Sequence, residues 1–242
     1  VIDYESFDGS DTSYNYGGRG AARFFDKRLE IGTTYIHEGM VGGEGNLGGV
    51  DATMKLDDKT RIKAEFASTG ADFNRVDSSG SAYMAEVSHR LEKLDGRAYI
   101  SEQDVDFGLG QQKGSETGTR KFGFDGTYRI TDPVSLRTEA FRQSNLSTDA
   151  ERDMVEVQMR YAKKKYDFQA GLRHAEDSLG NGDDNISEQI ILGSSFNMLN
   201  DRLIFRLMHD QSLPCNNENS DFPTGTTIGA DYMFIDSATI FM

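Results

Sequence analysis

Several segments of this chain alternate polar and apolar residues, and the charged side chains at the polar positions are the residues best placed to bind a solute. In residues 119–141, Lys121, Asp125 and Arg129 alternate with aromatic residues, and Arg137 and Glu139 continue the pattern after a turn. Such a row could line a water-filled passage or brace neighbouring strands through cross-strand ion pairs, and both interpretations stay open. The candidate water-facing binding residues are Arg61, Lys63, Glu65, Lys121, Asp125, Arg129, Arg137, Glu139, Glu156, Arg160, Asp167, Arg173 and Arg206.

No pattern in the sequence singles out a catalytic centre. The four histidines are far apart, without the close spacing of a metal site, and GxSxG and P-loop motifs are absent. The sequence therefore predicts no enzyme and no cofactor. Asp183 and Asp184, within GNGDDN (180–185), could hold a loop-bound calcium ion, although they lack EF-hand spacing and also fit a plain turn. Cys215, the single cysteine, is interpreted as an incidental loop residue, with a reactive or intermolecular thiol as the alternative.

Period-two alternation of apolar and polar residues predicts β-strands with one apolar and one polar face. Thr131, Asp132 and Pro133 interrupt the alternation with turn chemistry, so the sequence predicts a hairpin around them. Short turns are also predicted at 26–28, 57–59, 163–165 and 199–201. The predicted strands are about 9–12 residues long, roughly twice the usual ~5–6.

Short and long connections alternate along the chain, which places the short ones at one end of the strands. Long loops are predicted at 39–46, 70–79, 104–118, 146–153, 176–185 and 213–225. They hold most of the net charge of −14. An acidic rim could bind divalent cations or a basic partner, or the charge could simply keep the loops solvated. The acidic balance argues against a nucleic-acid partner.

Composition alone does not distinguish a folded protein from a partly disordered one, since only 36% of the 242 residues are hydrophobic and 27% are charged. The regular alternation argues against disorder. No run of ~18 apolar residues is long enough for a transmembrane helix. The chain starts at Val1 without a signal peptide, as expected for a mature protein or an excised piece. We expect a polar lead-in with a weak strand at 1–18 and β-barrel strands over 19–242.

The two predicted faces point to different surroundings. The charged face cannot be a protein core, because unpaired buried charges cost several kcal/mol each. The opposite face could contact lipid or pack as the core of a soluble sandwich. Small residues on it, such as Ala52, Ala64 and Ala170, and tyrosines near strand ends favour lipid. The alternative is a soluble extracellular β-sandwich that binds or adheres through its acidic loops.

Three repeated hairpins carry a family resemblance: LDDKTRIKAEFA (56–67), YRITDPVSLRTEAF (128–141) and YAKKKYDFQAGLR (161–173). They resemble bacterial outer-membrane β-barrels of the large kind, similar to porins and to the barrels of TonB-dependent receptors. The resemblance implies an all-β, antiparallel, up-and-down transmembrane β-barrel, here a segment of a larger one. It implies a porin-like channel or a scaffold that anchors a surface assembly. It also implies contact with outer-membrane lipid and lipopolysaccharide, a protein partner in such an assembly, and extracellular acidic loops.

Overall fold

The computed structural model describes residues 14–40, 43–73, 76–109, 117–179, 183–214, 222–235 and 238–241. These residues form fourteen β-strands. Their bounds are β1 Tyr16–Phe24, β2 Leu29–Met40, β3 Gly43–Lys55, β4 Thr60–Phe73, β5 Val76–Arg90, β6 Leu94–Gln103, β7 Thr119–Arg129, β8 Val134–Asn145, β9 Glu151–Lys163, β10 Tyr166–Leu179, β11 Asp183–Met198, β12 Leu203–Ser212, β13 Gly225–Ile235 and β14 Ala238–Phe241. Within the described ranges, no helix is long and apolar enough to cross a membrane.

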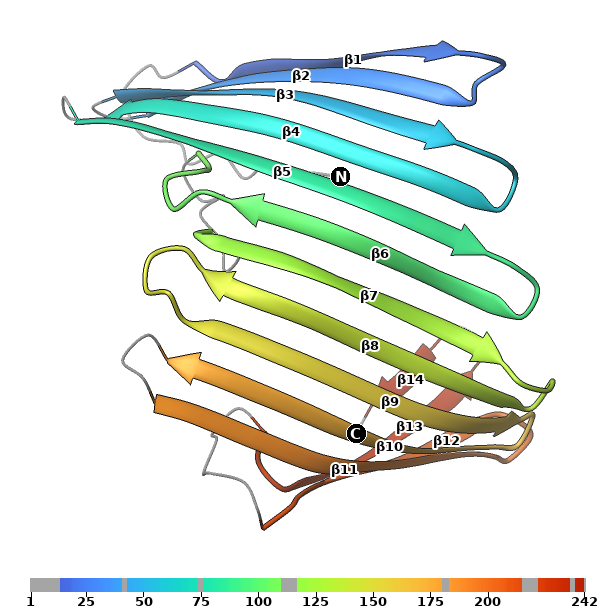
Figure 1. Ribbon diagram of the computed structural model, residues 1–242. Coiled ribbons are helices and arrows are strands. Elements are labelled where there is room, and N and C mark those ends of the chain that lie inside the picture. Colours follow the sequence, from blue (N-terminus) through green and yellow to red (C-terminus); the bar gives the residue numbers. More distant parts are fainter. Residues whose placement is uncertain are drawn as a thin grey trace. The chain divides into compact units, whose positions relative to one another are not determined.

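The strand order follows the chain order from β1 to β14, and the registers that define neighbours are antiparallel (Figure 1). This confirms the predicted all-β, antiparallel, up-and-down meander. In the described part of the chain, β1 and β14 are the two ends of the order, so the sheet is open.

The chain divides into two compact units. Unit 1 comprises Val1–Glu86 and Ile100–Arg120, and unit 2 comprises Val87–Tyr99 and Lys121–Met242. The division therefore crosses β5, β6 and β7.

Tight turns join the strands at one end of each hairpin, as predicted. Phe25, Asp26 and Lys27 have positive φ angles of 52°, 54° and 66° between β1 and β2. In the next turn, the Asp57 carboxylate accepts hydrogen bonds from the backbone N–H groups of Lys59 and Thr60, both at 2.7 Å. Such side-chain acceptors satisfy donors that a sharp reversal leaves without backbone partners.

The opposite ends of the strands differ from the prediction. Residues predicted as loops at 39–46, 70–79 and 176–185 are strand, except for the undescribed residues 41–42, 74–75 and 180–182. Of the predicted 146–153 loop, residues 151–153 belong to β9. The alternation signal fades there because both faces of the strand are polar, so period two is no longer visible although the ladder continues. The described residues 104–109 and 117–118 lie outside the strands between β6 and β7, and residues 213–214 and 222–224 lie outside them between β12 and β13.

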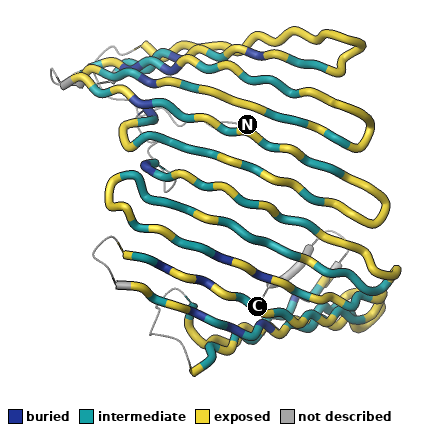
Figure 2. The backbone as a smooth tube through the Cα atoms, in the orientation of Figure 1, coloured by how far each residue is buried: buried dark blue, intermediate teal, exposed yellow. Residues whose placement is uncertain are grey.

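Most large apolar side chains lie on one exposed face, and few are buried. Leu172 and Ile228 are each 63% exposed, and Phe122 is 46% exposed. Along β7, exposed and half-buried residues alternate over 119–125 (Figure 2). Burial of an apolar core within the chain therefore does not account for the period-two pattern.

Candidate functional site

The exposed apolar face of unit 2 ends abruptly partway along β8 and β9. In β9, Tyr161, Met159, Val157 and Val155 occupy successive positions on this face, and Asp153 follows. Asp153 accepts hydrogen bonds from Nε and Nη2 of Arg142 on β8, at 2.6 and 2.5 Å. The register sets Arg142 directly opposite Asp153, so the pair closes the apolar stretch on both strands together.

On the neighbouring strands of unit 2, the apolar face also gives way to polar residues close to the Arg142–Asp153 pair. On β10, His174 follows Leu172 on the apolar face, and the register places it between Val155 of β9 and Glu188 of β11. His174 Nδ1 lies 3.6 Å from a Glu188 carboxylate oxygen. On β12, His209 follows Leu207 and hydrogen-bonds Thr226 at 2.8 Å.

Unit 1 shows a comparable boundary. Tyr35 on β2 donates a hydrogen bond to Asn46 on β3 at 2.7 Å, and His37 contacts the same amide oxygen at 2.9 Å. Tyr83 donates to the Glu102 carboxylate at 3.1 Å, and Arg120 also pairs with Glu102. In both units an apolar band next to the short turns gives way to hydrogen-bonded polar side chains.

The thirteen predicted water-facing residues all lie on the opposite, polar face of their strands. In unit 1, Asp51 is directly opposite Glu65, and Lys55 is opposite Arg61, so these side chains share a face. Lys63 Nζ lies 2.5 Å from Glu65 Oε1.

In unit 2, ion pairs join most of the predicted residues to one another or to oppositely charged side chains on adjacent strands. The pairs that include predicted residues are Arg160–Asp167, Arg173–Glu156, Arg137–Glu139, Arg206–Asp231 and Arg97–Asp125. Sequence reasoning missed Arg97, whose partner is 28 positions away, because the alternation says nothing about cross-strand register. Lys121 Nζ lies 4.0 Å from the Phe141 ring centroid, a cation–π contact.

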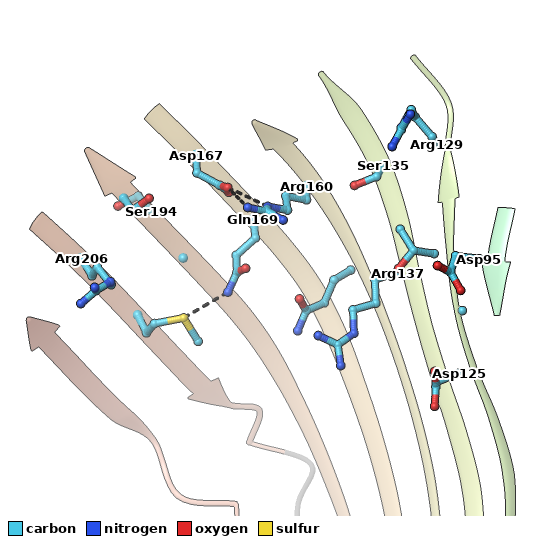
Figure 3. Close-up of a pocket in the computed structure, with 16 residues that line it drawn as sticks. Asp95, Asp125, Arg129, Ser135, Arg137, Arg160, Asp167, Gln169, Ser194 and Arg206 are labelled. Carbon is cyan, nitrogen blue, oxygen red and sulfur yellow. Dashed lines mark hydrogen bonds and ion pairs between the residues drawn. The ribbon is translucent and has the colours of Figure 1, made fainter. Parts of the chain in front are cut away.

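A hollow of about 680 Å³ opens on the polar face of unit 2, near the short turns (Figure 3). Its lining includes residues of β6 to β12, among them Thr127, Ser135, Gln158 and Ser195. Charged lining residues are Asp95, Asp125, Arg129, Arg137, Arg160, Asp167 and Arg206.

Glycine shapes one wall of this hollow. Gly193 lies between Gln169 on β10 and Met208 on β12 in the register. A Cβ at Gly193 would lie 2.5 Å from Gln169 Cγ. The bare backbone lets the Gln169 side chain cross β11 and reach Met208 Sδ at 3.0 Å. In unit 1, Gly32 similarly leaves space for the pairing of Arg19 Nη2 with Asp51 Oδ1 at 2.7 Å across β2.

The start of the connection between β6 and β7, residues 104–109, folds onto the polar face of unit 1. Leu109, only 2% exposed, forms an apolar cluster with Ile36 and Leu47, and Phe107 packs against it. The backbone N–H of Gly108 donates to Thr69 Oγ1 at 3.1 Å.

Asp104 fixes the start of this connection. Its carboxylate accepts hydrogen bonds from the backbone N–H and the hydroxyl of Ser81, at 2.8 and 2.7 Å. These bonds, the Ser81 hydroxyl first, lower the pKa of Asp104 because they stabilise its charged form.

The end of the connection between β12 and β13, residues 222–224, also contacts a polar face, that of unit 2. The Phe222 ring lies 5.4 Å from the guanidinium carbons of both Arg152 and Arg173. Its backbone carbonyl accepts hydrogen bonds from Gln189 Nε2 at 2.8 Å and Ser212 Oγ at 2.7 Å. Both connections were predicted as long loops, and a single large apolar residue in such a loop gives no periodic signal for these contacts.

The candidate calcium residues fall at the edge of the described ranges. Residues 180–182 and Cys215 lie outside the described residues, and Asp183 and Asp184 begin β11. Among the described residues, no three His, Cys, Asp or Glu side chains are grouped as metal ligands. The cation site stays a prediction.

No protein-family model matches this chain, and no curated protein sequence matches it significantly.

Proposed function

We propose that the chain is a membrane-embedded segment of a bacterial outer-membrane β-barrel. In this proposal the exposed apolar face contacts lipid, and the polar face lines a water-filled lumen. The lumen serves either as a porin-like channel or as the interior of a scaffold for a surface assembly. The longer connections lie on the extracellular side, near lipopolysaccharide.

The observation that carries this proposal is the sharp edge of the apolar band. On β9 and β10 the band covers Val155–Tyr161 and Tyr166–Leu172, and on β11 it reaches from Ile190 to Met198. These stretches of about seven to nine residues rise ~3.3 Å per residue. With the ~40° tilt of barrel strands, the band is roughly 18–23 Å high, comparable with the ~25 Å apolar band of outer-membrane barrels.

A soluble sandwich fits these observations less well. Its apolar face would pack against a second sheet along the full strand, whereas Val157 and Met159 are 39% and 53% exposed. The abrupt change to Arg142 and Asp153 has no counterpart in a sandwich core, because buried charges are costly there. At a lipid headgroup boundary the same change is expected.

Membrane extraction and gel migration test the proposal. We expect the protein expressed with an export signal to stay in the membrane fraction until detergent is added. We also expect unboiled and boiled samples to migrate differently, because strand pairing formed in the membrane resists detergent unfolding until the sample is heated. A chain that stays soluble and monodisperse without detergent would overturn the membrane assignment and favour the sandwich module.

A further inference from the structure

We propose that the hollow on the polar face of unit 2 binds a small polyatomic oxyanion, a phosphate or a carboxylate, through Arg129 and Arg137. This inference names a ligand class for the polar face and rests on the proposed function only for its location in a lumen.

The charges that line the hollow favour binding of an anion. Its three carboxylates are each bound by an arginine: Asp95 by Arg90 and Asp125 by Arg97, at 2.7 and 2.6 Å, and Asp167 by Arg160. A carboxylate already bound by a guanidinium repels an incoming anion less than a free one does.

The arginines of the hollow fall into two classes. Arg160 and Arg206 are each paired with an aspartate. In the described part of the chain, no carboxylate lies within 4.0 Å of Arg129, while Arg137 Nη2 is 3.6 Å from Glu139, beyond a good hydrogen bond. The side chain of Arg137 is 59% exposed. These two guanidinium groups therefore keep donors for a ligand.

The register places the two arginines on the polar face of neighbouring strands, beside neutral hydrogen-bonding groups. Figure 3 draws their guanidinium groups apart, so both side chains turn toward Ser135 when they bind one ion. The hydrogen bond from Ile130 N to Val134 O at 2.9 Å closes the β7–β8 hairpin, which sets Arg129 across from Ser135. Arg137 is directly opposite Gln158 on β9, whose Nε2 donates to Glu156 at 2.8 Å and has a second N–H left for a ligand. Hydroxyl and amide donors beside two guanidinium groups are the set that phosphate and carboxylate oxygens require.

Titration calorimetry with inorganic phosphate and with succinate, at constant ionic strength, tests the proposal. We expect saturable binding of at least one of them to the detergent-folded full chain, with a roughly millimolar dissociation constant, as for a few charge-assisted contacts in an open hollow. The two titrations distinguish a phosphate from a carboxylate ligand. Arg129→Gln and Arg137→Gln should each weaken binding about tenfold.

The matched control is Arg23→Gln in unit 1, which removes an arginine paired with Glu30 at 2.7 Å outside the hollow and should leave binding unchanged. Equal weakening by the control, or wild-type binding in both hollow variants, would overturn the proposal, as would the absence of saturable binding in a chain that shows heat-modifiable migration. A chain that is soluble without detergent but binds anions with this mutational pattern would refute the membrane proposal and leave the anion site standing.

Discussion

The β6–β7 and β12–β13 connections contact the polar faces of their units through different kinds of interaction. In unit 1, Leu109 and Phe107 pack on an apolar cluster that includes Ile36 and Leu47. In unit 2, Phe222 lies against Arg152 and Arg173, whose charges are bound by Asp177 and Glu156. A strand face of mixed charge can thus hold an apolar side chain either through a local apolar patch or through the faces of paired guanidinium groups.

Leu109→Ala should give the largest effect. Removing a side chain that is 2% exposed costs about 2–3 kcal/mol, which would loosen the unit 1 connection. The amide proton of Gly108, bonded to Thr69, should then exchange about 30- to 100-fold faster in hydrogen-exchange NMR. Val105→Ala, at a 49% exposed residue, is the control and should change little. Unchanged exchange at Gly108 would show that the cluster does not hold the connection.

Phe222→Leu should loosen the unit 2 connection by a smaller amount. The substitution keeps apolar bulk but removes two cation–π contacts of about 0.5–1 kcal/mol each. Limited proteolysis of residues 213–224 should become faster. High salt should also speed cleavage of the wild type, because it screens the ion pairs that position both arginines. If salt accelerated cleavage of the unit 1 connection equally, the proposed difference between a charge-dependent contact in unit 2 and an apolar contact in unit 1 would be wrong.

Acidification should release the start of the unit 1 connection. Because folding lowers the pKa of Asp104, its contribution is present above the ordinary aspartate pKa, about 4, and is lost as the pH falls through the lower folded value. Exchange at the Ser81 amide, which donates to Asp104, should therefore accelerate at acid pH after correction for intrinsic rates. Asp104→Asn should remove this dependence of the Ser81 exchange rate on pH. If the dependence were unchanged in that variant, another titrating group would cause it.

Two glycine substitutions should have the smallest effects. Gly32→Ala would place a Cβ 2.6 Å from Arg19 Nη2 and disturb an exposed ion pair, which contributes at most about 1 kcal/mol. Gly193→Ala would displace the Gln169 side chain, a neutral contact, and should cost a similar amount or less. Thermal unfolding of both variants, with Gly48→Ala as the control in open space, would measure the difference. A large loss in either variant would mean that the backbone itself must move.

The strands and their faces could be predicted because near the short turns one face is apolar and the other charged. The far halves of β3, β4 and β11 could not, since polar residues on both faces resemble loops. Ion pairs such as Arg152–Asp177 depend on register between strands, which no local pattern encodes. The roles of Leu109 and Phe222 were missed because a single apolar residue in a loop has no periodicity to interpret.

Fluorescence quenching along β9 tests the lipid-facing band most directly. Single cysteines would be introduced at 151–161 in a Cys215→Ser background, labelled with an environment-sensitive dye, and reconstituted into vesicles that contain quencher-bearing lipids. We predict strong quenching at Val155, Val157 and Met159, weak quenching at Glu156 and Gln158, and loss of the alternation from Asp153 to Glu151. Equal quenching of adjacent positions, or alternation that continues to Glu151, would contradict a lipid-facing band that ends at the Arg142–Asp153 pair.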